Sequence, residues 1–494
     1  MTKLTPYSWQ IRDQATLRAN NWTGLVAIEA GGGKSLTATL AIMEAKPRVT
    51  LIIAPQSTHE TAWIPTLRDN AGITPRIIGN GNKAAKEAYS AFRLGYPGIY
   101  LASPQWVTRT DVSDWSGDML IIDEIHQGAV TPGSKLQHKV SGYPGRADYN
   151  PLNLRFRHRL ALSATPMRGA FQNMWGVCKF LWPQYDQRGD IAAYNYTQWL
   201  YDRMDYVEVY TNQRDRDGNA KKVKQFQSEK HPGRLISEMP CVIIHKRRET
   251  CCAEPTHQGG FLPVDEPQII KRTVPLTAKQ RKAIREMSDS MFTWLDSNPL
   301  VAEIPLTAKQ RIRQLTLGEA DATTVMRKTD DGEVERTTLV FDKDCASPVV
   351  DETIHILSNL PTGEPVTVFM ESQRFAEVMT YRLNKAGFTA AEYSGVRKAD
   401  LSRFGQDFQV LVGVVSAIGT GTAGLNKVCS TEVWAEQPVS LTMQIQTQAR
   451  LERMDNTRRV QRYVLLDDEG VQLGRMEDLW LQKLVVNRSL RTVA

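Results

Sequence analysis

A glycine-rich stretch followed directly by a lysine and a serine is the part of the chain best suited to chemistry. Residues 30–35 read Ala-Gly-Gly-Gly-Lys-Ser, between the apolar run 25–28 and a helix-forming run. Backbone amides of such a loop, with the N-terminus of the next helix, bind phosphate groups. Lys34 would reach the outer phosphates, and Ser35 would bind Mg²⁺. The pattern predicts a phosphate loop, with a flexible turn as the alternative, because Ile28 stands where the full pattern has a glycine.

Two acidic residues follow a second apolar run, 119–122. Asp123 is placed to hold Mg²⁺ through a water molecule, and Glu124 to polarise the water that attacks a phosphoryl group. An acidic strand end that caps the next helix is the alternative. Ahead of the loop, Gln10 has an amide that can bond both the donor and the acceptor edge of adenine. Together these residues predict hydrolysis of ATP with magnesium.

The elements that must position these residues alternate between apolar runs and helix-length spacers. After the loop, four runs each end in a polar cluster, which is typical of a parallel sheet with a site at the carboxyl ends of its strands. These runs are 49–54, 98–102, 119–122 and 159–162. At that edge His126 would lie near Ser163 and Thr165 and could report the nucleotide state. A solvated loop histidine is the alternative.

Gly-Gly-Gly-Lys-Ser, Asp-Glu-Ile-His and Ser-Ala-Thr-Pro, in this order and spacing, resemble the motor core of superfamily-two helicases. Two further segments are similar to the Swi/Snf-type branch: Ala-Pro-Gln-Ser followed by Trp63, and 171–183, which reads Phe-Gln-Asn-Met-Trp and then Phe-Leu-Trp-Pro. Asp-Glu-Ile-His and Ser-Ala-Thr-Pro replace the branch's commoner Asp-Glu-Gly-His and Thr-Gly-Thr-Pro, and both resemble DEAH-type helicases instead.

The second half of the chain continues the resemblance. Its apolar runs alternate with helices but carry no second phosphate loop. Residues 419–426 are similar to the family's glycine-rich fifth motif, and 446–453 to its final motif, with Ala449 in place of a glycine. Arg450 and Arg453 are three apart, so on a helix they would share a face. The resemblance implies that this face meets the ATP and that the arginines stabilise the transferring phosphoryl group.

The resemblance implies an α/β fold of two RecA-like parallel-sheet lobes, the P-loop NTPase fold, with a helical insertion between them. We expect an ATP-binding lobe at 1–235, the insertion at 236–340 and a second lobe at 341–494. The insertion carries a basic segment, 243–248, and a Pro-Leu-Thr-Ala-Lys-Gln-Arg run at 275–281 that is repeated from Pro305. We expect each copy to start a helix capped by its threonine.

The expected site residues fall into groups with different roles. The ATP-binding residues are Gln10, Ala30, Gly31, Gly32, Gly33, Lys34 and Ser35. The catalytic residues are Lys34, Asp123, Glu124, Gln446, Arg450 and Arg453. Magnesium would be held by Ser35 and Asp123, and coupling would involve His126, Ser163 and Thr165. The resemblance implies contacts with a nucleic-acid backbone from Ser57, Ser103, Gln105, Arg374 and Thr422.

The bulk composition is that of a globular protein, with 41% hydrophobic and 23% charged residues among 494, and a net charge of +7 that suits nucleic-acid binding. We expect no membrane span and no signal peptide. None of the six cysteines forms a C-x-x-C pair, which favours the cytoplasm over a disulfide framework. Zinc ligands among Cys241, His245, Cys251, Cys252 and His257 are an alternative whose spacing matches no standard site.

The resemblance implies a DNA-stimulated ATPase that moves on duplex DNA in replication, recombination or repair. Such a compact form suggests a bacterial or phage protein with a nuclease or replication partner. One alternative is a strand-unwinding, DEAH-like helicase that acts on single strands of DNA or on RNA. The other is a scaffold that binds ATP only as a switch, against which the intact Lys34, Asp123, Glu124 and Arg450 argue.

Overall fold

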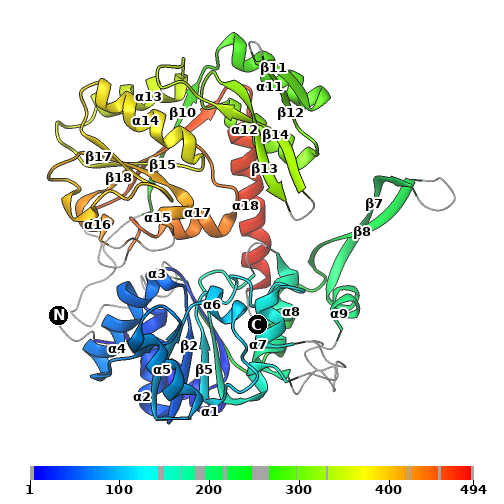
Figure 1. Cartoon of the computed structure of the whole chain (residues 1–494), viewed down its shortest axis with the longest axis vertical. Helices are drawn as coiled ribbons and strands as arrows, with labels where there is room; N and C mark the ends of the chain where they lie inside the picture. Colours follow the sequence, from blue (N-terminus) through cyan, green and yellow to red (C-terminus); the bar gives the residue numbers. More distant parts are fainter. Residues whose placement is uncertain are drawn as a thin grey trace. The chain divides into compact units, whose positions relative to one another are not determined.

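The computed structural model describes residues 5–142, 150–167, 170–183, 195–214, 220–246, 266–295, 298–329, 332–419, 422, 424–453 and 458–490 of the chain (Figure 1). The chain divides into two compact units. Unit 1 comprises Met1–Leu262 with Leu481–Ala494, and unit 2 comprises Pro263–Trp480. Each unit is built on one parallel sheet, so the predicted α/β class with two parallel sheets is confirmed.

Unit 1 contains a sheet of seven parallel strands. In spatial order they are β3 (Arg76–Ile77), β4 (Gly98–Ala102), β2 (Val49–Ile53), β5 (Gly117–Ile122), β6 (Phe156–Leu162), β1 (Gly24–Ile28) and β9 (Val242–His245). Strands β1 and β2 are buried at every residue. Continuous apolar runs are typical of parallel strands that are covered on both faces, and for this reason the sequence revealed them.

Helices and short turns connect the strands of unit 1, and several of these helices contact strands of its sheet (Figure 1). They are α1 (Ser8–Ala19), α2 (Lys34–Ala45), α3 (Gln56–Thr58), the π-helical turn η1 (His59–Trp63), α4 (Ile64–Ala71), α5 (Lys83–Arg93), α6 (Pro104–Arg109), α7 (Lys135–Val140), the 3₁₀ turns η2 (Leu152–Leu154) and η3 (Phe171–Asn173), α8 (Met174–Leu181), α9 (Tyr196–Arg203) and α10 (Arg234–Glu238). Helices α2 and α8 both contact β1, the strand that leads into the glycine stretch.

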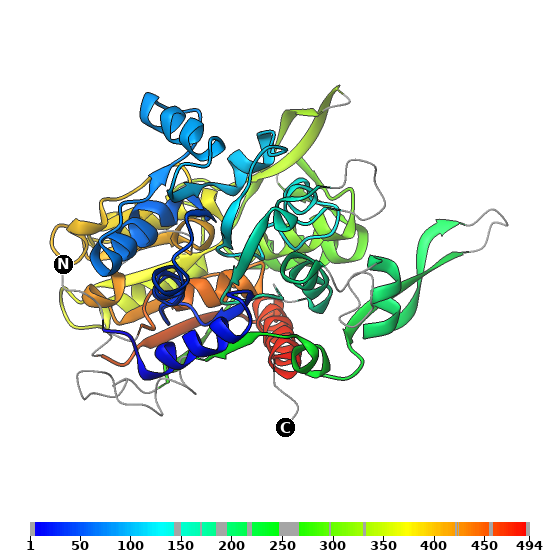
Figure 2. The same cartoon turned by 90° about the horizontal axis from the view of Figure 1, so that it is seen from below.

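A long antiparallel hairpin of unit 1 lies outside its main sheet. Strands β7 (Met204–Arg214) and β8 (Ala220–Glu229) form a separate two-stranded ribbon. It contacts α9 and η3 at its base and extends away from the rest of unit 1 (Figures 1 and 2). Residues 215–219 lie outside the described part of the chain.

Unit 2 contains a sheet of six parallel strands. In spatial order they are β10 (Gln268–Val274), β19 (Gln461–Asp467), β18 (Thr431–Trp434), β15 (Val366–Met370), β17 (Val410–Val414) and β16 (Ala390–Tyr393). The helices of this part of the chain are α13 (Pro348–Ser358), α14 (Gln373–Lys385), α15 (Val415–Ile418), α16 (Leu425–Val428), α17 (Leu441–Gln448) and α18 (Val471–Ser489), with the 3₁₀ turn η6 (Leu401–Arg403). Helices α13 and α14 bury their apolar residues in the core beside β15 and β17.

The segment that follows β10 in unit 2 contains strands as well as helices. Helices α11 (Ala278–Ser290) and α12 (Pro305–Leu315) alternate with two hairpins, β11 (Phe292–Leu295) with β12 (Asn298–Val301) and β13 (Asp321–Thr329) with β14 (Gly332–Val340). β-Branched residues in the last hairpin favour strand. The first sheet also continues past our boundary at residue 235, because β9 pairs with β1, and the second sheet begins with β10 inside the expected insertion.

The two copies of Pro-Leu-Thr-Ala-Lys-Gln-Arg start their helices differently. Thr277 caps α11, since its side chain accepts a hydrogen bond from the Gln280 backbone N–H at 3.2 Å, while the Gln280 side chain accepts one from Thr277 N–H. In the second copy the helix begins at Pro305 itself. Proline suits the first helical position, and Thr307 therefore lies inside the helix. The prediction of a threonine cap is correct for the first copy and wrong for the second.

Candidate nucleotide site

The glycine stretch forms a tight loop between β1 and α2. Gly31 and Gly33 have φ angles of +84° and +83°, in the left-handed region that favours glycine. A Cβ atom on Gly32 would lie 2.5 Å from the Ile28 side chain, so this position also has no room for a larger residue. Helix α2 begins at Lys34, directly after the loop. Backbone N–H groups at this turn and the start of a twelve-residue helix suit an anion.

Lys34 and Ser35 occupy the first positions of α2 and are partly exposed. The Lys34 ammonium donates a hydrogen bond to the Ile28 carbonyl oxygen at 3.2 Å, so it lies over the end of β1. Its positive charge lowers the pKa of Asp123 and so opposes burial and the Glu124 carboxylate, which raise it. The lysine of the loop and the first acidic residue therefore belong to one electrostatic environment.

Gln10 lies buried in α1 and supports the loop through its side-chain amide. The amide nitrogen donates to the Gly33 carbonyl and to the Thr37 hydroxyl, both at 3.3 Å, and the amide oxygen accepts a bond from Tyr7 N–H at 3.0 Å. The sequence suggested that this amide would face adenine. The structure shows the amide bonded to the loop, and this supporting contact was not among the expectations.

Asp123 follows β5 at the same edge of the sheet and is almost fully buried. Its carboxylate accepts hydrogen bonds from the Trp63 indole N–H and from Glu124 N–H, both at 2.9 Å. Burial raises the pKa of Asp123 to about 6, and the neighbouring Glu124 carboxylate adds to the increase. Lys34 and the bond from Trp63 lower the pKa. Carboxylate oxygens of this kind are ligands that magnesium prefers.

Glu124 connects the acidic pair to a buried histidine. Its backbone has a φ of +48°, which is unusual for a residue with a side chain and redirects the chain after β5. The Glu124 carboxylate lies 3.3 Å from His126 Nδ1. The same nitrogen lies 2.8 Å from the Ser163 hydroxyl, which also accepts a hydrogen bond from Thr165 N–H at 2.9 Å. The alternative of a solvated loop histidine is wrong, because His126 is 2% exposed.

The three residues of unit 1 expected to contact nucleic acid follow strands of the same sheet. Ser57 lies on α3 after β2 and is exposed. Ser103 follows β4 and caps α6, since its hydroxyl accepts a bond from Trp106 N–H at 3.3 Å. Gln105 is exposed on α6. Because all seven strands are parallel, these residues share the edge that carries the glycine loop.

In unit 2, Arg450 and Arg453 lie beyond the end of their helix. Helix α17 ends at Gln448, so the prediction that both arginines share a helical face is wrong. The chain turns after Gln448 and directs the Arg450 guanidinium to the carbonyl oxygens of Thr422, at 2.8 Å, and of Gly419. Gln446 remains on the helix and is buried.

Thr422 and Arg374, the remaining expected contacts, are also bonded within unit 2. The Thr422 hydroxyl is buried and donates to the Ile418 carbonyl at 3.0 Å. Arg374 is exposed at the start of α14, and its guanidinium donates to the Thr338 hydroxyl and the Leu339 carbonyl of β14, both at 2.9 Å. Arg374 is thereby joined to the hairpin β13–β14.

Of the cysteine and histidine residues that could have bound zinc, the structure describes Cys241 and His245. Cys241 packs against Gly24, whereas the His245 imidazole Nε2 lies 3.0 Å from the carboxylate oxygens of Asp13. Cys251, Cys252 and His257 lie outside the described residues. Among the described residues, no three or more histidine, cysteine or acidic side chains gather as metal ligands.

Two contacts near the loop involve residues that sequence reasoning did not assign to the site. Trp63 bonds Asp123, and the tryptophan of the Swi/Snf-like segment was the signal that could have identified it. His245 accepts a hydrogen bond from Glu29 N–H through its backbone carbonyl at 3.0 Å, and its ring packs against Trp9 with centroids 4.2 Å apart. No motif marked this contact between β9 and the loop.

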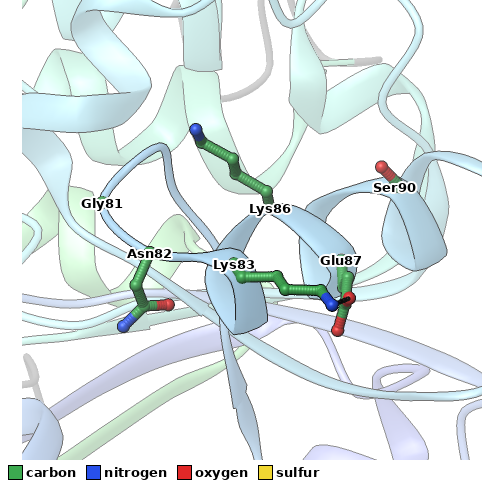
Figure 3. A pocket seen from close by; sticks show the side chains of 6 residues that line it. All are labelled: Gly81, Asn82, Lys83, Lys86, Glu87 and Ser90. Carbon is green, nitrogen blue, oxygen red and sulfur yellow. Dashed lines mark ion pairs between the residues drawn. The ribbon is translucent and has the colours of Figure 1, made fainter.

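A cavity of about 530 Å³ lies elsewhere in unit 1, at the start of α5 (Figure 3). The Asn82 side chain caps this helix by accepting a bond from Ala85 N–H at 2.9 Å, and Lys83 and Glu87 form an ion pair at 3.8 Å. No residue of the glycine loop or of the acidic pair lines this cavity. Its lining residues are Gly81, Asn82, Lys83, Lys86, Glu87 and Ser90. The cavity is therefore separate from the candidate site.

No family model matches the chain, and a search of curated proteins finds no significant match. Within the described residues, no helix has the length and apolar character that crossing a membrane requires.

Proposed function

We propose that the protein is an ATP-dependent DNA translocase built from two RecA-like lobes of the P-loop NTPase fold. One observation carries the proposal: the glycine loop with Lys34 and the Asp123–Glu124 pair meet at the carboxyl edge of one parallel sheet. In such sheets ligands bind at this edge. The loop supplies backbone donors for phosphate, and the acidic pair supplies oxygen ligands and a base, which is the equipment for phosphoryl transfer to water.

In this proposal each residue has a defined task. The loop amides and the Lys34 ammonium bind the β- and γ-phosphates, while Ser35 and Asp123 hold Mg²⁺, whose charge offsets that of the phosphates. The donor set fits this ion, since it consists of a hydroxyl and a carboxylate. Glu124 orients a water molecule against the γ-phosphorus and accepts its proton as the bond to the leaving ADP breaks.

Residues outside the acidic pair would couple the state of the nucleotide to the rest of the protein. His126 contacts both Glu124 and Ser163, so a change at the γ-phosphate can reach β6 through two side-chain contacts. The resemblance assigns Arg450 and Arg453 to the charge of the transferring phosphoryl group. Because Arg450 is bonded to two carbonyls of its own unit, this role requires it to exchange those bonds for phosphate oxygens.

ATPase assays with duplex DNA, single-stranded DNA and RNA test the proposal. We expect duplex DNA to stimulate hydrolysis and the protein to displace a triplex strand from duplex DNA in the presence of ATP. Lys34→Ala and Glu124→Gln should each reduce turnover about a hundredfold or more. Lys86→Ala, which removes an exposed lysine of α5, is the matched control and should leave turnover unchanged.

Each class of alternative gives a different result. Stimulation by RNA alone would exclude the DNA translocase, and separation of strands without triplex displacement would indicate an unwinding helicase. ATP binding without hydrolysis would indicate a switch. Turnover that survives both Lys34→Ala and Glu124→Gln would show that the site is elsewhere.

A further inference from the structure

The hairpin β7–β8 has one face that combines aromatic rings with lysines. Its register places Tyr206 opposite Phe226, Glu208 opposite Lys224, and Tyr210 opposite Lys222. Residues directly opposite each other in an antiparallel pair lie on the same face, and alternate residues of one strand share that face. These six side chains therefore form one surface, which we name the tyrosine–lysine face.

The lysines of this face lie against its rings. Lys224 Nζ is 4.3 Å from the centroid of Tyr206 and 4.7 Å from that of Tyr201, a residue of α9 at the base of the hairpin. Lys222 Nζ is 5.3 Å from the centroid of Tyr210. Both ammonium groups are exposed. Contact with the ring faces holds the positive charges beside the aromatic surface.

The outer part of the face is open to solvent. Tyr210 is 70% exposed and Tyr206 40% exposed, and the ribbon extends away from the rest of unit 1 (Figures 1 and 2). A two-stranded ribbon is marginally stable in water by itself, and exposed aromatic clusters mark binding surfaces. An aromatic and cationic face on such a ribbon suits a ligand that is both flat and negatively charged.

We propose that the tyrosine–lysine face binds single-stranded DNA, with a base stacked on Tyr210 and phosphates near Lys222 and Lys224. The choice of DNA as the ligand of this face rests on the proposed function, in which the protein acts on DNA. A tyrosine ring can stack on any base whose face is free, and lysines follow the backbone without reading sequence. Bases of a duplex are already stacked on one another and offer no free face, so the rings select a single strand.

One carboxylate also lies on the face and must be taken into account. The Glu208 carboxylate is 3.7 Å from Lys222 Nζ, and both groups are exposed. Surface pairs of this kind contribute little to stability and open readily. A phosphate can therefore replace Glu208 as the partner of Lys222, and the binding should weaken as salt is added.

Fluorescence anisotropy with a labelled single strand and a labelled blunt duplex tests this proposal on the full chain. We expect Tyr210→Ala to weaken single-strand binding about fivefold to a hundredfold, which is the range that loss of one stacked base gives. Tyr210→Phe keeps the ring and should bind as the unchanged protein does. Lys222→Ala should reduce the slope of log affinity against log salt by about 0.7.

Gln225→Ala is the matched control, because Gln225 pairs with Val207 on the opposite face of the ribbon. It should leave single-strand binding unchanged, and duplex binding should be unchanged in all of these variants. If the unchanged protein binds neither DNA, the proposed function and this inference both fail. If it binds DNA and hydrolyses ATP but Tyr210→Ala binds the single strand equally well, the inference alone fails.

Two other outcomes also overturn the inference. An equal loss of duplex binding in Tyr210→Ala would assign the face to a duplex backbone. An equal loss in Gln225→Ala would show that the affinity depends on the folding of the ribbon and not on the ring.

Discussion

Replacing Trp63 by phenylalanine tests whether one hydrogen bond keeps Asp123 ionised. Trp63 is fully buried in η1, and its indole N–H donates to Asp123 at 2.9 Å. Phenylalanine keeps most of the apolar ring but has no donor, so one carboxylate oxygen loses its partner. The other oxygen keeps the bond from Glu124 N–H. The change therefore acts on the charged form of Asp123, and it also removes part of a buried ring, a packing loss that any control must match.

The size of the expected pKa shift follows from the burial of the Asp123 carboxylate. Burial and Glu124 already raise the pKa of Asp123 to about 6. A hydrogen bond to a buried charge contributes about 1.5–3 kcal/mol, and its loss should raise the pKa by about one to two further units. Only the ionised form can hold magnesium. At pH 7 we expect about a twofold to tenfold loss of activity in Trp63→Phe, which recovers as the pH approaches about 9.

The pH dependence of kcat/KM for ATP hydrolysis measures this shift, because its acid limb reports the free enzyme. The unchanged protein should lose activity below a pH of about 6, and the variant should do so at higher pH. Trp115→Phe is the matched control. Trp115 is also fully buried, but its indole donates to the Tyr89 hydroxyl at 3.2 Å. An acid limb that stays in place, or moves to lower pH, in a folded Trp63→Phe protein would refute the reasoning.

Three further substitutions test contacts that stabilise the glycine loop of unit 1 and the core of unit 2. Gly33→Ala places a Cβ 2.7 Å from the Gln10 amide at a φ of +83°, so nucleotide affinity in a fluorescence titration should fall about tenfold or more. Gln10→Ala removes three hydrogen bonds and should lower the free energy of unfolding in urea by about 2–4 kcal/mol. Arg462→Met leaves the fully buried Glu432 carboxylate without its ion-pair partner and should cost about 3–5 kcal/mol in the same assay, part of which Glu432→Gln should restore.

The central strands of the first sheet could be predicted because they are largely buried on both faces. The run 119–122 is continuously apolar and ends at Asp123, and the structure places it at the end of β5. The same reasoning placed β1, β2, β4 and β6. Burial on both faces removes the alternation that marks a half-exposed strand, and the polar residue that follows then shows where the strand leaves the core.

The rest of the fold depends on contacts that no local pattern records. Strand β9 is short, and it belongs to the first sheet only because it pairs with β1, more than 200 residues earlier in the chain. The hairpin β13–β14 occupies a segment that the resemblance made helical. The end of α17 at Gln448 was missed for the same reason: a continued helix also suits the sequence, but the Arg450 guanidinium bonds the carbonyls of a loop that precedes it by about thirty residues.

The candidate site is therefore positioned largely by residues outside its motifs. Gln10 bonds the Gly33 carbonyl from α1, and the His245 carbonyl in β9 receives Glu29 N–H at the other end of the loop. Asp13, also in α1, lies 3.0 Å from the His245 imidazole and links these two supports. The loop thus has few ways to move without disturbing α1 and β9 together. In the proposed function the motif residues supply the chemistry, while their geometry depends on a helix and an edge strand that lie far apart in the sequence of unit 1.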